Sequence, residues 1–346
     1  MNRLVLIDGH AIIHRAYHAY PQTLKTRNGE LMNAVYGFTS ILLSVLKELK
    51  PEYVACAFDL PVPTFRHKKY KKYKAHRPKI DKELKQQIPK AKGVVKTLNI
   101  PIFEKEGYEA DDVIGSLAFQ AKLPNIKNEK QNIKNTYKIS KNKKRKRIKE
   151  YKSPRKFLET IIVTGDKDAL QLIDNNIKVF MPGRGQRPAK MFNRKRFLKK
   201  YGFEPRQLID YKALCGDPSD NIPGVKGVGP KTTTKLIIKF GGIKQIYENI
   251  GKIESKVVDK LTNQKDQAFL SLELAEIVTN VPIKLDLKKC RLLDYDKEKI
   301  IRLFEELEFR SLIGRLPGIE KGAKTPKLQT SKTLKNKDGE RQMGLF

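Results

Sequence analysis

Three carboxylates crowd into four positions of the stretch GYEADDVIG, where Glu109, Asp111 and Asp112 lie within residues 107–115. The chain that carries them has a formal net charge of +34, so this local clustering of acids calls for an explanation. Two explanations are open from the residues alone. The acids could begin a solvated helix, whose N-terminal dipole favours negative charge, or they could form a cage for a multivalent cation.

Aspartate also ends three short apolar runs of the chain. RLVLID ends in Asp8, EYVACAFD in Asp59 and ETIIVTGD in Asp166. Because these runs alternate with helical patterns such as NAVYGFTSILLSVLKELK, they predict an α/β fold with a parallel sheet. Ligands of open parallel sheets lie beyond the carboxyl ends of the strands, so we expect the three aspartates to converge on one edge. The helical pattern of residues 109–122 places the first cluster at the same edge.

The expected acidic cluster has nine members. They are Asp8, Asp59, Glu109, Asp111, Asp112, Asp166, Asp168, Asp217 and Asp220. Carboxylates this close repel one another unless they are protonated or bound to cations, and hard divalent ions are the usual remedy. Because no histidine or cysteine accompanies them to favour zinc, the set fits Mg²⁺ or Mn²⁺. Two such ions ~4 Å apart can polarise a phosphodiester and activate a water molecule.

Each acid taken singly also has a structural explanation. Asp8 precedes a glycine and Asp59 precedes Leu60 and Pro61, which are positions typical of turns, and the EADD segment could be a helix start. Turn chemistry gives no reason, however, for an aspartate after every predicted strand or for the close pairs in DKD and DPSD. The cluster as a whole therefore favours a cation site.

The composition indicates a polyanionic partner. Lysine and arginine number 72 against 38 aspartates and glutamates, which favours nucleic acid over a membrane surface. No apolar run approaches the ~18 residues of a membrane span, and the first residues enter a strand directly, so we expect a cytoplasmic protein. Cys56, Cys215 and Cys290 are odd in number and widely spaced, which predicts ordinary reduced thiols.

Two regions and two atypical segments are expected along the chain. The strand signal fades after Met181, so residues 1–181 are expected to form the α/β domain and residues 182–316 a mainly helical region. Residues 121–156 hold 15 basic side chains against 2 acidic ones, and residues 317–346 are polar and lysine-rich. Both segments are expected to be mobile, because such compositions bury too little apolar surface to offset chain entropy.

Seven motifs in order resemble the 5′-to-3′ exonuclease domain of bacterial DNA polymerase I and, more broadly, the flap endonuclease family. They are LIDGH, AVYGF, FRHKKYKKYKAHR, GYEADDVIGSLA, TGDKDALQL, DYKALCGDPSDNIPGVKGVGPKT and LEFRSL. The resemblance implies a parallel-sheet, PIN-like nuclease domain followed by a helix-hairpin-helix region. It also implies that the nine acids bind two Mg²⁺ ions, with Mn²⁺ as a substitute.

The implied activity is 5′-3′ exonuclease and structure-specific 5′ flap endonuclease on DNA, by two-metal hydrolysis, for primer and flap removal in replication and repair. The implied substrates are 5′ flaps, duplex ends and RNA-primed junctions, acted on by a monomer. Two alternatives stay open. One is a catalytically idle protein that binds branched DNA, and the other is a PIN-type ribonuclease that shares the acidic edge.

The segment TFRHKKYKKYKAHRPK interleaves Tyr70 and Tyr73 with basic residues, which suits phosphate contacts and stacking on unpaired bases. In the family this segment begins a helical arch, expected here at about residues 62–100. Lys74 and Arg77 then resemble the groups that contact the scissile phosphate. A solvated basic face is the alternative reading. Arg15 is a weaker candidate for a phosphate contact.

The segment IPGVKGVGPKT places Gly224, Gly227 and Gly229 before a helix that opens at a proline. Glycines let the backbone approach a phosphate, and a helix N-terminus offers N–H groups to it. The segment resembles the family's helix-hairpin-helix element, which implies that Lys231 and Thr232 contact duplex phosphates.

Three histidines recur every four residues at His10, His14 and His18, which invites a zinc hypothesis. Packing or DNA contact is the better interpretation, because no further ligands are spaced to complete a zinc site.

The chain departs from the family pattern in two places. The basic segment 121–156 is an insertion, either a tether for nucleic acid or an unselective surface loop. The polymerase and proofreading domains do not follow, so a stand-alone nuclease is expected. The ending RQMGLF resembles the peptide with which bacterial replication proteins bind the sliding clamp, with Gln342, Leu345 and Phe346 as anchors, although a meaningless apolar end is the alternative.

Overall fold

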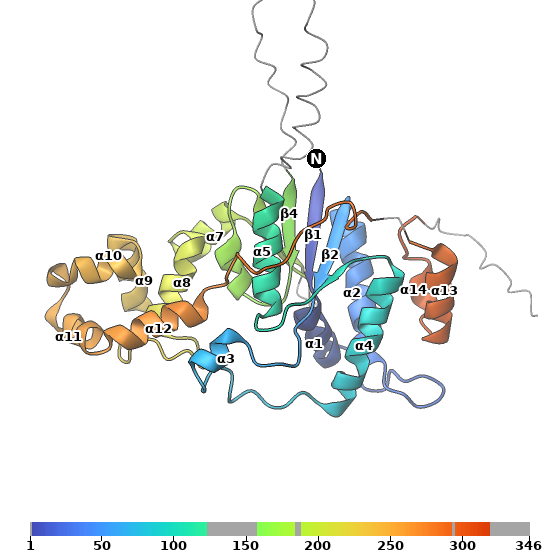
Figure 1. Cartoon of the computed structure of the whole chain (residues 1–346), viewed down its shortest axis with the longest axis horizontal. Helices are drawn as coiled ribbons and strands as arrows, with labels where there is room; N and C mark the ends of the chain where they lie inside the picture. Colours follow the sequence, from blue (N-terminus) through green and yellow to red (C-terminus); the bar gives the residue numbers. More distant parts are fainter. Residues whose placement is uncertain (1, 123–157, 184–187, 293–294, 319–346) are drawn as a thin grey trace, which may run out of the picture.

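A mixed β-sheet lies at the centre of the protein, whose computed structural model describes residues 2–122, 158–183, 188–292 and 295–318 (Figure 1). The strand order is β3-β2-β1-β4-β5-β6. Neighbouring strands from β3 to β5 are parallel, and β6 pairs antiparallel with β5. The strands are β1 (Arg3–Asp8), β2 (Tyr53–Ala57), β3 (Ile102–Phe103), β4 (Glu159–Val163), β5 (Ile177–Met181) and β6 (Lys190–Phe192).

The central strand β1 explains why the apolar runs in the sequence are continuous rather than alternating. It pairs with β2 on one side and β4 on the other, with Leu4 opposite Tyr53 and Thr160. Val5 faces one layer of helices and Leu4 the other, and both are fully buried. A strand covered on both faces needs apolar residues at every position. The expected α/β class is confirmed.

One face of the sheet packs against helices from both ends of the described chain. These are α1 (Gly9–Ala19), α2 (Asn33–Leu49), α4 (Lys82–Thr97), α13 (Lys297–Glu306) and α14 (Arg310–Ile313). In Figure 1 α13 and α14, in red, lie beyond α4 on the right of the molecule. The short helix α3 (Phe65–Lys69) precedes α4.

The other face packs against α5 (Ala110–Lys122) and the helical region. As expected, the inward side of α5 is apolar, with Val113 and Leu117 buried. The helical region holds α7 (Arg194–Tyr201), α8 (Leu208–Cys215), α9 (Pro230–Phe240), α10 (Ile243–Glu248), α11 (Ser255–Asn263) and α12 (Lys265–Ala275). Three short 3₁₀ turns are η1 (Asp168–Leu172), η2 (Pro205–Gln207) and η3 (Ile250–Lys252).

The packing does not follow the boundary expected at residue 181. Strand β6 extends the sheet, and α13 and α14 bury Phe304 and Leu312 in the core that contains α2. The chain therefore leaves the α/β layers, forms the helical region and returns to them. Helix α4, expected within the arch, packs on α2 through Leu84 and Val94. Most of the basic insertion and nearly all of the tail, including the proposed clamp peptide, lie outside the described residues.

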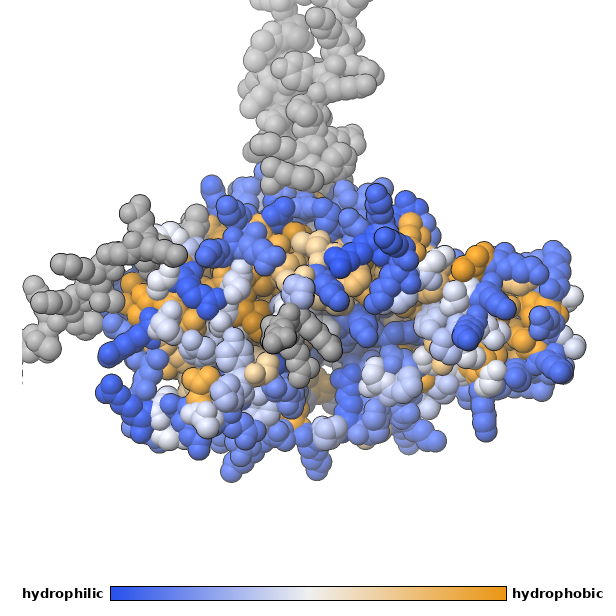
Figure 2. Space-filling view, turned by 180° about the vertical axis from the view of Figure 1, so that it is seen from behind, coloured by the Kyte–Doolittle hydropathy of each residue, from blue (hydrophilic) through white to orange (hydrophobic). Residues whose placement is uncertain are grey.

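Hydrophilic side chains predominate on the face of the molecule seen in Figure 2. Large apolar side chains that are exposed are few in the described ranges, and Ile238 is the most exposed of them at 61%. No helix in these ranges is long and apolar enough to cross a membrane. The three cysteines are free thiols, two of them buried.

Candidate active site

Asp8 is the last residue of β1 and caps the helix that follows. One carboxylate oxygen accepts a hydrogen bond from the Ala11 amide at 2.9 Å, and the other accepts one from the Thr164 hydroxyl at 2.7 Å. Burial raises the pKa of Asp8 to about 7, against the effect of these two hydrogen bonds, and the charges of Asp59 and Asp166 raise it further. The carboxylates after β1, β2 and β4 therefore lie close enough to influence one another, as the strand order requires.

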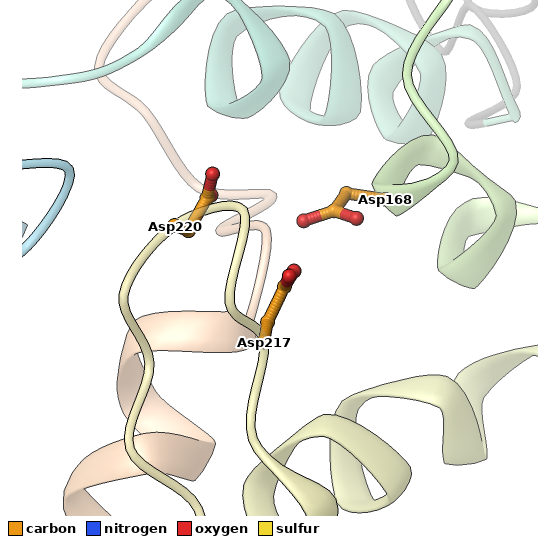
Figure 3. Close-up of side chains that lie close together, drawn as sticks. All are labelled: Asp168, Asp217 and Asp220. Carbon is orange, nitrogen blue, oxygen red and sulfur yellow. The ribbon is translucent and has the colours of Figure 1, made fainter. Parts of the chain in front are cut away.

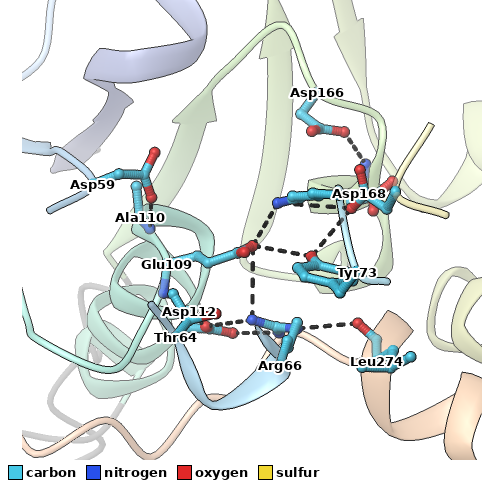
Figure 4. Close-up of polar contacts among 12 residues, drawn as sticks. Asp59, Thr64, Arg66, Tyr73, Glu109, Ala110, Asp112, Asp166, Asp168 and Leu274 are labelled. Carbon is cyan, nitrogen blue, oxygen red and sulfur yellow. Dashed lines mark hydrogen bonds and ion pairs between the residues drawn. The ribbon is translucent and has the colours of Figure 1, made fainter. Parts of the chain in front are cut away.

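Asp59 connects the loop after β2 to the first turn of α5. Its Oδ1 accepts a hydrogen bond from the Ala110 amide at 2.7 Å (Figure 4). Its own amide donates to Nδ1 of His10 at 3.0 Å, so His10 serves to position this loop. Burial, followed by the charges of Asp8 and Asp166, raises the pKa of Asp111 well above its ordinary value. We name Asp8, Asp59, Asp111 and Asp166 the first carboxylate group.

Asp168, Asp217 and Asp220 form a second carboxylate group, where the loop after α8 meets the start of η1. Oxygen atoms of the three side chains lie within 4.8 Å of one another, and the side chains point toward a common centre (Figure 3). Asp168 begins η1, whereas the other two lie on the loop after α8. Burial raises the pKa of Asp168 to about 6, with a further contribution from Asp166. The charge of Asp166 thus links the two groups.

Besides His10 at Asp59 and Arg66 at Glu109 and Asp112, three basic side chains contact the expected acids. Nζ of Lys74 donates to Oε2 of Glu109 at 2.8 Å and lies 3.7 Å from Asp220. The guanidinium of Arg77 also pairs with Asp220. Burial by itself would raise the pKa of Glu109, but the charges of Lys74 and Arg66 reverse this and hold it below its ordinary value.

The third cation is Lys212 in α8, which the sequence analysis did not single out. Its ammonium group pairs with both Asp168 and Asp217. Although burial favours the neutral acid, Lys212 and hydrogen bonds from Ser219 lower the pKa of Asp217 below its ordinary value. The sequence feature that could have identified Lys212 is its position five residues before Asp217 in the motif DYKALCGD.

Asp112 differs from the other eight acids, because one buried guanidinium group holds both of its oxygens. Arg66 donates to them with two hydrogen bonds of 2.7 Å (Figure 4). The amides of Glu109 and Val278 also donate to them, at 3.1 and 3.0 Å. The side chain of Asp112 is fully buried. These contacts favour a structural role for Asp112 over the ligand role that the resemblance implies. Arg66 was missed at the sequence level, because nothing in the local sequence distinguishes it from the many other basic residues of its segment.

The structure also differs from the expectation for Tyr73. This residue is 2% exposed, and its hydroxyl group donates to Glu109 and Asp220 at 3.2 Å each. It therefore cannot present its ring to an unpaired base in this conformation. Tyr73 belongs to a small apolar cluster with Ile209 and Ile222, and the half-buried Tyr70 packs against this cluster. The alternation of tyrosine with lysine in the sequence does not predict which tyrosine is buried and which is exposed.

Arg15 contacts backbone rather than open solvent, because its guanidinium donates to the carbonyl groups of Pro182 and Gly183 at 2.5 and 2.6 Å. Of the three histidines of α1, His10 and His14 are partly buried with their ring centroids 6.1 Å apart, whereas His18 is exposed. Within the described ranges they are not part of a group that could hold a metal ion.

The three glycines of the expected hairpin have unequal surroundings. Gly224 is buried with φ of 63°, and a Cβ there would lie 2.2 Å from the Gly216 amide nitrogen, so this glycine serves the packing of the loop. Gly227 and Gly229 are exposed, and Gly229 caps the N-terminus of α9. Lys231 in the first turn of α9 is also exposed, and Thr232 is half-exposed. The accessible part of the hairpin thus begins after Gly224.

The donor set of both carboxylate groups fits divalent cations. It consists of carboxylate oxygens, which are the ligands that hard divalent ions prefer. Asp168, Asp217 and Asp220 offer oxygens within 4.8 Å of one another, and burial with like charge raises the pKa of Asp8 to about 7, as expected where a cation would relieve the repulsion. Glu109 is linked to Asp220 of the second group through Tyr73 and Lys74.

The fold and the site together define an α/β protein whose mostly parallel sheet carries clustered carboxylates, suited to divalent cations, at its carboxyl edge and is joined to a helical region. Residues 3–134 match the family described as 5′-3′ exonuclease, N-terminal resolvase-like domain, and residues 203–298 match 5′-3′ exonuclease, C-terminal SAM fold. The chain belongs to this 5′-3′ exonuclease family, which confirms the resemblance.

Relatives and solved structures agree with this assignment. DNA polymerase I of Caldicellulosiruptor bescii is 39% identical over 316 residues, covering 91% of this chain and 33% of the relative, and that of Bacillus subtilis is 35% identical, covering 91% and 32%. The chain thus spans about a third of the length of these relatives. The D15 protein of bacteriophage T5, co-crystallised with metal ions, shares the fold with a TM-score of 0.58 at 17% identity, covering 89% of this chain and 99% of that chain. The catalytic core of Rad2 in complex with a DNA substrate has a TM-score of 0.55 at 15% identity, covering 91% and 93%.

Proposed function

We propose that this chain hydrolyses DNA near 5′ ends, as a 5′-3′ exonuclease and 5′ flap endonuclease that depends on two Mg²⁺ ions. The observation that carries the proposal is that carboxylates at or after β1, β2, β4 and the start of α5, and on the loop after α8, gather at one edge of the sheet. Lys74 and Arg77, which we call the arch cations, contact two of these acids, Glu109 and Asp220. Such an arrangement costs stability through repulsion and serves no evident packing purpose. Family membership supports the same activity.

Each carboxylate group would hold one ion. Asp8, Asp59, Asp111 and Asp166 are the proposed ligands of one ion, and Asp168, Asp217 and Asp220 of the other. Glu109 is proposed to contribute between them. Bound ions would polarise the phosphodiester, lower the pKa of the attacking water and stabilise the leaving oxygen, and Mn²⁺ would substitute for Mg²⁺.

The arch cations are proposed to bind the scissile phosphate. Lys74 and Arg77 contact Glu109 and Asp220 in this structure, so they already lie at the acidic edge. Exchanging these carboxylate partners for phosphate oxygens preserves their charge-assisted hydrogen bonds. Downstream, the exposed Gly227, Gly229 and Lys231 are proposed to contact phosphates of the duplex, together with the amides of the first turn of α9.

Three remaining assignments are part of the proposal. The expected arch, residues 62–100, would admit a 5′ single strand. Because α4 is packed against the rest of the protein, we propose that the strand passes along the part of the arch that precedes α4. The end of the chain, with Gln342, Leu345 and Phe346, would bind a sliding clamp. The protein would act as a cytoplasmic monomer on flaps, duplex ends and RNA-primed junctions.

Product mapping on a 5′-labelled flap duplex, with and without Mg²⁺, tests substrate, cofactor and cut position together. We expect cleavage near the junction that requires Mg²⁺, and a loss of at least about 100-fold in rate for Asp166→Ala with DNA binding retained, since a metal ligand is removed. Binding without cleavage by the wild type would instead support an idle DNA-binding protein. Faster cleavage of single-stranded RNA than of flap DNA would support a PIN-type ribonuclease.

A further inference from the structure

Lys212 differs from the two arch cations in the element that carries it. It lies in the packed helix α8, whose residues Ala213 and Leu214 are fully buried, whereas Lys74 and Arg77 lie in the irregular segment between α3 and α4. The side chain of Lys212 is 12% exposed. Its position at the acidic group is therefore set by the helical region and not by the arch.

The ammonium group of Lys212 uses oxygens of the second carboxylate group. It donates to Oδ1 of Asp168 and to Oδ2 of Asp217, two side chains that point toward each other in Figure 3. Their side chains are only 17% and 12% exposed. A Mg²⁺ ion bound here would need carboxylate oxygens at about 2.0–2.1 Å, and the ammonium would compete with it for the same oxygens.

The charges indicate what this contact does. Two poorly solvated carboxylates that face each other repel strongly without a cation, and one ammonium group supplies a single positive charge between them. A divalent ion supplies two, but it must first displace the ammonium or tolerate a positive neighbour. One lysine therefore has two opposite effects, since it stabilises the metal-free arrangement and disfavours the metal-bound one.

We propose that Lys212 is an internal counter-ion that occupies the divalent-ion position between Asp168 and Asp217 and turns away when an ion binds there. The ion in the second carboxylate group consequently binds more weakly than it would to the bare acids. The first carboxylate group has no lysine in an equivalent contact among the described residues, so the two ions are expected to differ in affinity. This inference rests on the proposed function, because it takes the acidic edge to be a divalent-ion site.

The test compares wild type with Lys212→Met, which keeps the length of the side chain and removes its charge. Titration calorimetry with Mn²⁺ in the absence of DNA measures ion affinity, and thermal denaturation in EDTA and in saturating Mn²⁺ measures stability. We expect the weaker Mn²⁺ site to bind about tenfold more tightly in the variant, equivalent to about 1.4 kcal/mol. The melting temperature should fall in EDTA and stay near that of wild type in Mn²⁺.

Two further variants serve as controls. Lys178→Met removes a lysine that pairs with Glu159 at the other end of the sheet, and it should leave Mn²⁺ affinity unchanged. Lys212→Arg keeps the charge and should retain the stability of wild type in EDTA. If Lys212→Met does not fold without metal, Lys212→Gln purified in Mn²⁺ and titrated after dialysis provides the same comparison.

The outcomes separate this inference from the proposed function. Mn²⁺ binding by wild type, with equal or weaker binding by both Lys212→Met and Lys212→Gln, would overturn the counter-ion role and leave the metal site intact. A loss of melting temperature that is equal in EDTA and in Mn²⁺ would also overturn it, because a purely structural lysine predicts that result. Absence of Mn²⁺ binding in wild type and variants alike would refute the proposed metal site itself.

Discussion

Acids of the same type have different acid strengths in this protein because their neighbours differ. Burial raises the pKa of Asp8 to about 7 and that of Asp168 to about 6. Glu109 and Asp217, although also removed from solvent, have lowered pKa values because Lys74 and Lys212 contact them. The acidic edge therefore contains carboxylates whose pKa a neighbouring lysine lowers and carboxylates whose pKa burial raises, and the pKa of Asp168 is raised even though Lys212 contacts it.

This division predicts how the stability of the metal-free protein depends on pH. Because the folded pKa of Asp8 is raised above the ordinary value of 3.8, the folded protein holds a proton that the unfolded chain releases. The free energy of unfolding should therefore fall as the pH rises from about 4 to about 7. Asp8→Asn removes this contribution, so at pH 8 in EDTA the variant should melt a few degrees above wild type, about 2–4 °C for each kcal/mol.

Thermal denaturation from pH 5 to pH 8 in EDTA measures this effect. Asp259→Asn, a change at an exposed position of α11, is the matched control and should keep the pH dependence of wild type. A wild-type melting temperature that rises over this range, or an Asp8→Asn variant no more stable than wild type at pH 8, would contradict the prediction.

At the scale of elements, Arg66 joins three segments that are distant in the sequence. It lies in α3, pairs with Asp112 in the first turn of α5, and donates to the carbonyl group of Leu274 (Figure 4). It also donates to the carbonyl group of Glu276 at the end of α12. The side chain is 3% exposed. The base of the arch, the acidic helix and the helical region are thus fixed to one another by one buried guanidinium group.

Loss of either partner of this pair should be costly. Arg66→Met leaves Asp112 buried without its cation, and we expect a loss of about 3–5 kcal/mol in the free energy of unfolding. Asp112→Leu should be destabilising for the same reason. The double variant should be clearly more stable than the sum of the single losses predicts, because no charge is left unpaired.

Urea denaturation of the four proteins measures the coupling free energy between Arg66 and Asp112. Additive losses would show that the pair does not act as a unit. Mn²⁺ stoichiometry of Asp112→Asn gives a second readout, since a structural Asp112 predicts no lost ion and a ligand predicts one.

At the scale of the whole molecule, a chain with a net charge of +34 carries a cluster of acids. The acids favour cations, whereas the net charge of the chain favours a polyanionic partner such as DNA. Binding that depends on phosphate contacts releases counterions and is therefore steeply sensitive to salt.

The salt dependence of DNA binding measures these phosphate contacts directly. Lys231→Ala should reduce the slope of log K against log salt concentration by about 0.9, the contribution of one phosphate contact on duplex DNA. Fluorescence anisotropy with a duplex in Ca²⁺ or EDTA gives the slopes without cleavage. Lys47→Ala, on an exposed face of α2, should leave the slope unchanged, and equal slopes for wild type and Lys231→Ala would exclude the hairpin contact.

Much of the fold could be predicted from local sequence patterns. The three Val- and Ile-rich runs became β1, β2 and β4, and the helical period of residues 33–50 became α2. Strands β3, β5 and β6 were not among the predicted runs, and β3 and β6 have only two and three residues and lie at the edges of the sheet. The return of α13 and α14 to the sheet was also missed, since an amphipathic pattern says that a face is buried but not against which partner.

The sequence alone determined which chemistry is available: oxygen ligands without sulfur or imidazole among them, placed after strands that must share an edge because parallel strands run the same way. Only the tertiary structure decided how each charged side chain is used. Asp112, Tyr73 and Gly224 became interior residues, and Lys212 came to lie between two acids. The physical reason is that burial and pairing depend on neighbours from distant segments, which residue type and local spacing do not specify.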